Sequence, residues 1–196
     1  MAVVLVDAGG TNIGSVRYAL QRLGVDAALT SDAATIRAAD KVILPGVGAA
    51  GPGMARLRGM GLVGLLRSLT QPVLGVCLGM QLLCTRSEEG DTECLGLISA
   101  PVQRFTEAPG LRVPHMGWNR LATVRPHPLL AGLGEDEQAY FVHSFAVPTG
   151  DWTLATADYG GPFSAVVARG NFHGMQFHPE RSAAVGAKLL KNFLAL

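Results

Sequence analysis

The chain changes from an apolar strand to a helix within Pro72-Val73-Leu74-Gly75-Val76-Cys77-Leu78-Gly79-Met80-Gln81. Cys77 stands between two glycines in the pattern Gly-x-nucleophile-x-Gly, which lets a strand reverse sharply and leaves the nucleophile exposed above the sheet. A cysteine at the first turn of a helix also lies at the positive end of the backbone dipole, which favours the reactive thiolate. The alternative is a buried cysteine that acts only as a small hydrophobe, but the flanking glycines directly after a strand favour a nucleophile.

A second candidate group lies in Gly174-Met175-Gln176-Phe177-His178-Pro179-Glu180. This apolar stretch is typical of a strand and ends in a histidine and a carboxylate. Residues i and i+2 of an extended backbone point to the same side, so we expect Glu180 to hydrogen-bond one imidazole nitrogen of His178 and leave the other for Cys77. The three side chains then form a triad. The alternative is a strand end before a helix that Ser182 caps, with Glu180 merely solvated.

Composition limits what surrounds these residues. The 196 residues, 48% of them hydrophobic, suit one domain over residues 1–196, and the formal charge of +1 does not indicate a nucleic-acid-binding surface. Three cysteines without a C-x-x-C pair indicate neither a disulfide framework nor a zinc site, so we expect a reducing compartment and no metal or cofactor. The sequence shows neither a signal peptide nor an apolar run long enough for a bilayer, which predicts a soluble, cytoplasmic protein.

The order of the expected elements indicates an α/β fold. Strands are expected at residues 2–7, 25–29, 41–45 and 73–77, and helices near 13–23 and within 61–70. This alternation is typical of a parallel sheet covered on both faces. From about residue 95 onward, strand candidates follow one another at residues 97–105, 120–124, 139–145, 152–157, 163–169 and 172–177, before a closing helix at 183–194. We therefore predict a single α/β domain with a central mixed, mostly parallel sheet flanked by helices.

A glycine-rich loop follows the third expected strand. Gly46-Val47-Gly48-Ala49-Ala50-Gly51 matches the G-x-G-x-x-G pattern of dinucleotide-binding proteins, but no Asp or Glu occurs between residues 40 and 88, whereas that pattern needs an acidic residue about 20 positions on. An oxyanion hole is the better interpretation. In elbow enzymes a loop after an earlier strand supplies one N–H, here from Val47 or Gly48, and the residue after the nucleophile, here Leu78, supplies another.

Together these motifs resemble those of the triad (class I) glutamine amidotransferases. The likeness rests on Pro45-Gly46-Val47-Gly48, on Gly75 to Gln81 and on His178-Pro179-Glu180, and it extends over essentially the whole chain. Within that family the chain is similar to the glutaminase subunit of imidazole glycerol phosphate synthase. The segments that carry this closer likeness are Pro114-His115-Met116-Gly117-Trp118-Asn119, Tyr140-Phe141-Val142-His143-Ser144 and Phe177-His178-Pro179-Glu180-Arg181-Ser182.

The resemblance implies hydrolysis of glutamine to glutamate and ammonia. Cys77 would form a γ-glutamyl thioester, His178 would move the proton and Glu180 would orient His178, so the family's triad coincides with the one predicted from the residues. The same resemblance implies side chains and backbone that hold the two ends of glutamine. These are Gly48, Gln81, Glu89, Ser144 and Phe145. The alternatives are an exposed helix position for Gln81 and an ordinary acidic loop residue for Glu89.

The resemblance also implies a partner subunit, because ammonia needs an acceptor site and the glutaminase fold uses the whole chain. In the family this partner is a (β/α)₈-barrel cyclase, with which the glutaminase forms a heterodimer. The cyclase takes ammonia through a tunnel and makes imidazole glycerol phosphate and AICAR in histidine biosynthesis. Interface candidates are Asn12, Trp118, Tyr140 and Arg181. Trp and Arg are common interface anchors, and core packing is the alternative for the two aromatic residues.

Other functions compete with this interpretation. The chain could serve a different synthase of the same class, act as a stand-alone cysteine hydrolase on peptides or γ-glutamyl compounds, or only bind the cyclase as a regulatory subunit. A further hypothesis concerns the loop Pro45-Gly46-Val47-Gly48, whose glycines permit peptide reorientation. In the free chain an N–H of this loop would point away from the oxyanion position, and binding of the partner's ligand would turn it inward.

Overall fold

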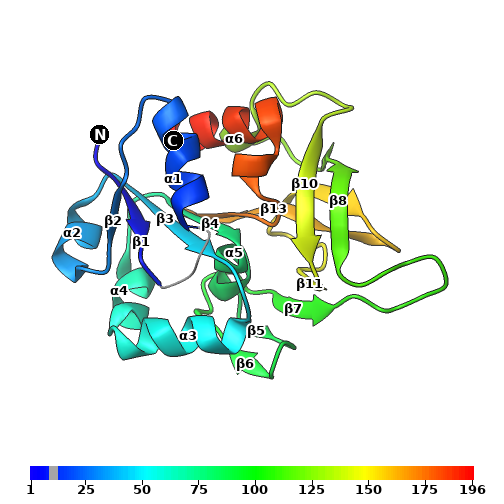
Figure 1. Ribbon diagram of the computed structural model, residues 1–196, viewed down its shortest axis with the longest axis horizontal. Coiled ribbons are helices and arrows are strands. Elements are labelled where there is room, and N and C mark those ends of the chain that lie inside the picture. Colours follow the sequence, from blue (N-terminus) through cyan, green and yellow to red (C-terminus); the bar gives the residue numbers. More distant parts are fainter. Residues whose placement is uncertain (9–12) are drawn as a thin grey trace.

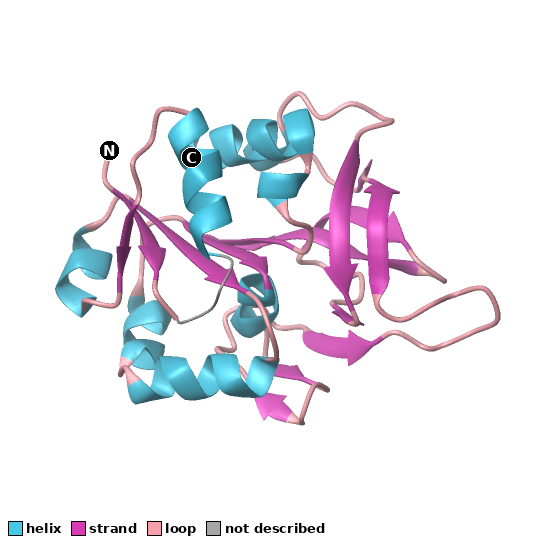
Figure 2. Cartoon of the chain, viewed as in Figure 1, coloured by secondary structure: helices cyan, strands magenta, loops and turns pink. Residues whose placement is uncertain are grey.

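The computed structural model describes residues 1–8 and 13–196 and confirms the predicted α/β fold (Figure 1; Figure 2). The strands of the main sheet are β1 (Val3–Val6), β2 (Ala28–Thr30), β3 (Lys41–Gly46), β4 (Val73–Cys77), β9 (Ala122–Thr123), β12 (Thr153–Asp158), β13 (Pro162–Arg169) and β14 (Phe172–Met175). They follow the order β2-β1-β3-β4-β14-β13-β12-β9. Pairing is parallel from β2 to β14 and antiparallel from β14 to β9. The sheet is therefore mixed and mostly parallel.

Helices cover both faces of this sheet (Figure 1). They are α1 (Ile13–Arg22), α2 (Ala33–Ala38), α3 (Ala50–Gly59), α4 (Leu62–Ser68), α5 (Leu78–Leu83) and α6 (Ala183–Ala195). Val3 and Leu5 of β1 belong to one apolar cluster, with residues of α1 and α6, whereas Val4 and Val6 belong to a second cluster, with residues of α2 to α5. Because successive strand residues point to opposite faces, a strand buried on both faces is a continuous apolar run.

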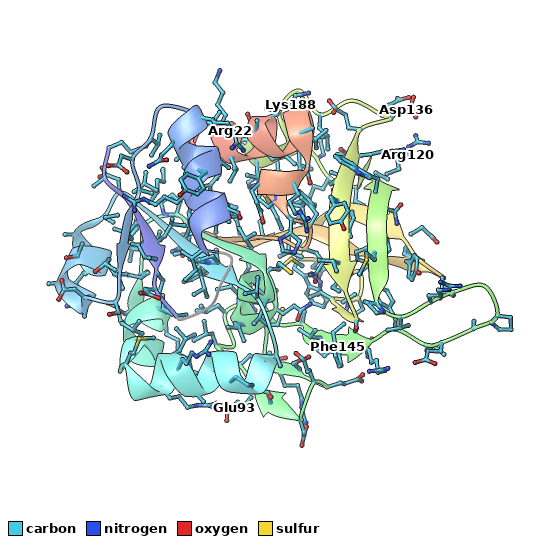
Figure 3. The ribbon with its side chains drawn as sticks, in the orientation of Figure 1. Arg22, Glu93, Arg120, Asp136, Phe145 and Lys188 are labelled. Atoms are coloured by element: carbon cyan, nitrogen blue, oxygen red, sulfur yellow. The ribbon has the colours of Figure 1, made fainter. Side chains whose placement is uncertain are left out.

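Most charged side chains lie at the outside of the molecule, with Lys41 and the Glu180 carboxylate as buried exceptions. Figure 3 labels Arg22, Glu93, Arg120 and Asp136, and all four are exposed. Lys188 on α6 reaches the carbonyl oxygen of Gly132 at 2.7 Å. Within the described ranges, no helix combines the length and the apolar character that crossing a membrane requires.

The second half of the chain departs from the expected single sheet. Two smaller sheets stand beside the main one: β8 (His115–Arg120) with β10 (Gln138–His143), and a four-stranded sheet of β5 (Arg86–Ser87), β6 (Thr92–Glu93), β7 (Pro101–Arg104) and β11 (Phe145–Ala146). Only β7 forms within the strand expected at 97–105, and only β9 forms within the strand expected at 120–124. Strands of two residues contain no full period of alternation, so their pairing cannot be recognised in the sequence.

Three elements of the first half also differ from the expectation. The strand expected at 25–29 lies at Ala28–Thr30, and neither α2 nor α3 was predicted. The first turn of α3 contains Gly51, Pro52 and Gly53, which resemble a loop in sequence. Proline is compatible with a first helical turn because the N–H groups there have no helical acceptor. Gly53 lets α3 pack closely on α5, since a Cβ at this position would lie 3.1 Å from a methyl carbon of Leu82.

Candidate active site

Cys77 occupies a sharp turn between the end of β4 and the start of α5. Its backbone has φ 54° and ψ −113°, a conformation that costs an L-residue about 1–3 kcal/mol. The two glycines of the motif let the helix pass directly over the strands. A Cβ at Gly75 would lie 2.6 Å from the carbonyl carbon of Gly79, and a Cβ at Gly79 would collide with the carbonyl oxygen of Leu44. The sequence therefore places the sulfur at the carboxyl end of the parallel strands.

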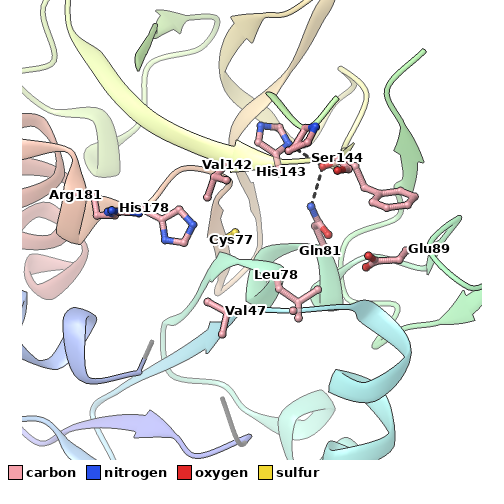
Figure 4. A pocket seen from close by; sticks show the side chains of 13 residues that line it. Val47, Cys77, Leu78, Gln81, Glu89, Val142, His143, Ser144, His178 and Arg181 are labelled. Atoms are coloured by element: carbon pink, nitrogen blue, oxygen red, sulfur yellow. Dashed lines mark hydrogen bonds between the residues drawn. The ribbon is translucent and has the colours of Figure 1, made fainter. Parts of the chain in front are cut away.

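The sulfur of Cys77 opens into a cavity of about 360 Å³ (Figure 4). The cavity brings together most of the predicted site residues from widely separated segments. They are Val47, Gly48, Cys77, Leu78, Gln81, Glu89, Ser144, Phe145, His178 and Arg181. Pro114, Val142 and His143 line it as well and were not predicted, although all three lie within motifs quoted above. Val47 and Gly48 come from the loop between β3 and α3, where Gly48 has φ +93°.

His178 lies between Cys77 and Glu180. Its Nδ1 is 2.9 Å from Oε1 of Glu180, and its ring lies next to Cys77 (Figure 4), whose influence raises the pKa of the imidazole. Glu180 belongs to a 3₁₀ turn, η2 (Pro179–Arg181). The expected contact between His178 and Glu180 is present, but the expected extended backbone is wrong. The 3₁₀ turn, and not a strand, brings the carboxylate to the imidazole.

The surroundings of His178 favour its protonated form. Burial alone would lower the pKa of this imidazole, but the hydrogen bonds with Cys77 and Glu180, and the charges of both groups, outweigh burial and raise the pKa to about 10. An imidazole that carries a proton next to the sulfur can act as a general acid when a leaving group departs.

Ser182 fixes the segment that carries His178. Its hydroxyl donates to the carbonyl oxygen of His178 at 2.7 Å and accepts from the N–H of Tyr140 at 2.9 Å. The N–H of His178 in turn donates to the carbonyl oxygen of Tyr140 at 2.9 Å. Ser182 precedes α6 but makes no side-chain cap hydrogen bond to that helix. Its hydroxyl instead ties the His178 segment to β10.

Gln81 is buried, so the alternative of an exposed helix position is wrong. Only 4% of the residue is accessible, and its Nε2 donates to the carbonyl oxygen of Phe145 at 2.9 Å. The same carbonyl accepts from Nδ1 of His143 at 2.8 Å. Two donors from different elements therefore hold the backbone at Phe145 beside the cavity.

The imidazole of His143 contacts a second buried imidazole, that of His115. Nδ1 of His115 lies 3.1 Å from Nε2 of His143. Burial lowers the pKa of His143 to about 3 and that of His115 to about 4, so both rings are neutral near pH 7. Since Nδ1 of His143 must donate to a carbonyl, its Nε2 accepts, and His115 donates to it. The contacts thus fix the tautomer of His143.

Glu89 is half-buried and lines the cavity. Its Oε2 accepts the N–H of Ala50 at 2.8 Å, and Ala50 is the first residue of α3. The carboxylate therefore satisfies one of the N–H groups that the first turn of a helix leaves without a helical acceptor. It also holds the loop that carries Val47 and Gly48 against the segment of β5 and β6.

Three of the four interface candidates form one surface cluster, which we call the aromatic patch: Trp118, Tyr140 and Arg181. Trp118 on β8 pairs directly with Tyr140 on β10, with ring centroids 6.1 Å apart. The guanidinium carbon of Arg181 lies 4.9 Å from the centroid of the Tyr140 ring. Trp118 is 52% exposed, which contradicts core packing for this residue. Asn12, the fourth candidate, lies outside the described residues.

The chemistry of the cavity is that of acyl transfer through a sulfur nucleophile. A thiol, an imidazole in contact with it and a carboxylate that orients the imidazole form the arrangement of nucleophilic catalysis. In the part of the chain that the structure describes, no three His, Cys, Asp or Glu side chains gather as they would around a metal ion.

Comparison with known proteins gives the same class. Residues 4–196 match the family model of glutamine amidotransferase class-I. The chain is similar to two solved structures, one of a glutamine amidotransferase (TM-score 0.78, 21% identity, 100% of this chain and 98% of that one) and one of PurLQS from Thermotoga maritima (TM-score 0.73, 20% identity, 99% of this chain and 97% of that one). At these identities the structures show a shared fold.

Relatives with higher sequence identity narrow the assignment. The imidazole glycerol phosphate synthase subunit HisH of Xanthomonas axonopodis pv. citri is 59% identical over 194 residues, which is 99% of this chain and 97% of that protein. The subunit of the same name from Xylella fastidiosa is 57% identical over 194 residues, with the same coverage of both chains. The chain therefore belongs to the class-I glutamine amidotransferases and, within them, to the family of the imidazole glycerol phosphate synthase subunit HisH.

Proposed function

We propose that this chain is the glutaminase subunit of an imidazole glycerol phosphate synthase. It hydrolyses glutamine to glutamate and ammonia, and ammonia passes to a cyclase subunit that makes imidazole glycerol phosphate and AICAR in histidine biosynthesis. The observation that carries the proposal is the contact of His178 with both Cys77 and Glu180 at a cavity, in a chain that is 59% identical to a HisH subunit over nearly its whole length.

In the proposed reaction the sulfur of Cys77 attacks the side-chain amide carbon of glutamine. His178 gives its proton to the amide nitrogen, the C–N bond breaks, and ammonia leaves a γ-glutamyl thioester. A water molecule then attacks the thioester and passes a proton to His178, the C–S bond breaks, and glutamate leaves. Glu180 keeps the imidazole in position through Nδ1. One water is consumed, and the thiolate and the protonated imidazole are restored.

Two sets of groups support this chemistry. We propose that the N–H of Leu78 and that of Val47 or Gly48 form an oxyanion hole for the tetrahedral intermediate. Gln81, Glu89, Gly48 and the backbone at Ser144 and Phe145 hold the charged ends of glutamine. A cavity of about 360 Å³ falls within the size range of small-molecule sites.

The aromatic patch is the proposed docking surface for the cyclase. An exposed tryptophan beside an arginine is typical of an interface anchor, and Met116, two residues from Trp118 on the same strand, is 63% exposed. We propose a (β/α)₈-barrel partner in a cytoplasmic heterodimer, with a tunnel that carries ammonia. Because Arg181 also lines the cavity, the docked partner would lie next to the place where ammonia forms.

The loop at Val47 and Gly48 is the proposed gate of the reaction. Gly48 has φ +93°, a conformation that glycine adopts without strain. The partner's ligand would favour the loop conformation that turns an N–H toward the oxyanion, which requires that this ligand bind the two conformations with different affinity. Little ammonia would then form without an acceptor.

Glutamate release from glutamine tests the function, first with the chain alone and then with the cyclase and its nucleotide ligand. We expect low activity alone and a large rise with the liganded cyclase. Cys77→Ala should lower glutamine-dependent product formation by at least about 1,000-fold, because it removes the nucleophile. Formation of imidazole glycerol phosphate from added ammonia should persist in this variant, since the cyclase site is intact.

Other results of these assays would favour one of the alternative functions. Similar activity with and without the cyclase would indicate a stand-alone hydrolase or a different synthase. Equal use of glutamine by Cys77→Ala would refute the thioester mechanism. If the wild-type complex uses only ammonia and never glutamine, the chain is a regulatory subunit.

A further inference from the structure

Gln176 is a fully buried polar residue next to the reacting sulfur, and the mechanism above gives it no role. It follows β14, two positions before His178, and none of its surface is accessible. Its N–H donates to the carbonyl oxygen of Ala165 at 2.9 Å, which fixes its backbone. Its side-chain amide lies between Gln81 and Cys77.

The direction of each hydrogen bond around Gln176 follows from one carbonyl group. The oxygen of Phe145 can only accept, so Gln81 must present Nε2 to it, at 2.9 Å. The other hydrogen of that nitrogen donates to Oε1 of Gln176 at 3.0 Å. Both hydrogens of the Gln81 amide are then used, and Oε1 of Gln81 remains as an acceptor.

The same chain of bonds orients the amide of Gln176. Since its Oε1 accepts from Gln81, its Nε2 points the other way, and this nitrogen lies 4.0 Å from the sulfur of Cys77. The contact is long, but sulfur is a large and polarisable acceptor, and an N–H donor interacts more strongly with a thiolate than with a thiol. The sulfur thus lies next to both the His178 ring and the Gln176 amide.

We propose that Gln176 is a positioning residue of the glutaminase site, whose amide stabilises the Cys77 thiolate through Nε2 and fixes the Gln81 side chain through Oε1. This inference rests on the proposed function, because Gln81 is there a contact for glutamine. One side chain then aligns the nucleophile and the substrate contact with each other. A purely structural glutamine would satisfy buried polar groups without affecting the reactivity of the sulfur.

Two variants separate the two halves of this role. Gln176→Glu keeps an oxygen that accepts from Gln81 but places a carboxyl group beside the sulfur, where a second negative charge opposes thiolate formation. Gln176→Met has a similar length and removes both the acceptor and the donor. Gln21→Glu, at an exposed position of α1, is the control with the same chemical change far from the cavity.

The first readout is the pH dependence of alkylation by iodoacetamide, which requires neither glutamine nor the cyclase. All three cysteines are buried, but only Cys77 lines the cavity, through which the reagent can reach it. Burial raises the pKa of the Cys84 and Cys94 thiols, that of Cys94 to about 11, so we expect these two to react little. We expect the midpoint to move upward by about one pH unit in both Gln176 variants and to stay unchanged in Gln21→Glu.

The second readout is glutamine hydrolysis in the complex with the liganded cyclase. Gln176→Glu should lower kcat by about 10-fold with little change in KM, whereas Gln176→Met should lower kcat and raise KM, each by about 10-fold. The difference in KM between the two variants measures how well Gln176 fixes the Gln81 side chain. The loss of kcat that both variants share measures the effect of Gln176 on Cys77.

The proposal is overturned if both variants alkylate with the midpoint of Gln21→Glu, or if their kcat and KM match those of the control. Circular dichroism first establishes that each variant is folded. If Gln176→Met does not fold, the alkylation and the kinetic measurements on Gln176→Glu alone decide the test. If the wild-type complex releases no glutamate, the proposed function fails, whereas the alkylation profile still decides whether Gln176 stabilises the thiolate.

Discussion

At Gly79 the chain leaves no room for a side chain, because a Cβ there would collide with the carbonyl oxygen of Leu44. The strand β3 and the helix α5 thus approach each other backbone to backbone, and this approach holds Cys77 at its unfavourable φ of 54°. The free energy stored in that single residue is about 1–3 kcal/mol. Packing of the neighbouring elements must offset it.

Substitution of this glycine tests the close approach. We expect Gly79→Ala to lower the free energy of unfolding by at least about 2 kcal/mol, because the backbone atoms that the methyl group meets cannot move aside. Gly64→Ala, on the exposed side of α4 with no atom within 4 Å of the new Cβ, should raise it by about 0.5–1 kcal/mol. Guanidinium unfolding of both variants measures the difference, and equal effects would contradict the steric argument.

The residues of the cavity could be predicted only where chemistry appears in a short motif. Cys77, His178 and Glu180 stand in such motifs, and the structure brings them together. Gln176 stands in the same motif as His178 and was not predicted as a site residue, because its contacts with Gln81 and Cys77 span 95 and 99 positions. A contact of that length depends on strand order, which local patterns do not specify.

At the level of the elements, β1, β3 and β4 were predictable because they are buried on both faces and are therefore continuous apolar runs, whereas the exposed β2 was misplaced. The helix α3 was not predicted because the glycine and proline residues of its first turn are typical of loops. The strand β8 was not predicted because it lies within a motif that indicates function but not secondary structure. The 3₁₀ turn η2 could not be expected from a stretch that resembles an extended strand. Each error arises where tertiary packing overrides local preference.

β14 carries a buried histidine that makes the stability of the sheet sensitive to acid. Nδ1 of His173 has no hydrogen-bond partner among the described residues. Burial, with a smaller effect of His127, lowers the pKa of His173 to about 4. In the unfolded chain the pKa is about 6.5, so between these values the unfolded state binds more protons. The contribution of His173 to stability is therefore present at neutral pH and is lost as the pH falls from about 6.5 to about 4.

We expect His173→Leu to flatten the pH dependence of unfolding. Between pH 6.5 and 4 the free energy of unfolding of the variant should fall less steeply than that of the wild type, by up to about 1.4 kcal/mol per pH unit. Guanidinium unfolding at several pH values in this interval provides the test. Parallel curves for both proteins would show that His173 titrates alike in the folded and the unfolded chain.

For the whole molecule, the aromatic patch and the cavity share Arg181. We expect Arg181→Glu to raise the dissociation constant for the cyclase by at least about 10-fold, because it reverses the charge of a candidate anchor and removes its contact with Tyr140. Since Arg181 is exposed, the fold should not change. Titration calorimetry measures the affinity.

Arg37→Glu on α2 is the matched control, because it makes the same charge change at an exposed position of a different element. Its affinity for the cyclase should equal that of the wild type. An unchanged affinity in Arg181→Glu would remove Arg181 from the interface and would leave Trp118 and Tyr140 as the candidates for the docking surface.

The place of β14 in the sheet also has a consequence for protein synthesis. This strand lies between β4 and β13, yet Phe172–Met175 is synthesised after every other strand that the structure describes. Until it emerges, the edge of β4 has no neighbour there, and an open edge is a site where chains pair wrongly. The same order of synthesis brings His178 and Glu180 to Cys77 only after the other described strands have been made. Synthesis of this segment is therefore one requirement for activity, in addition to the proposed gate at Val47 and Gly48.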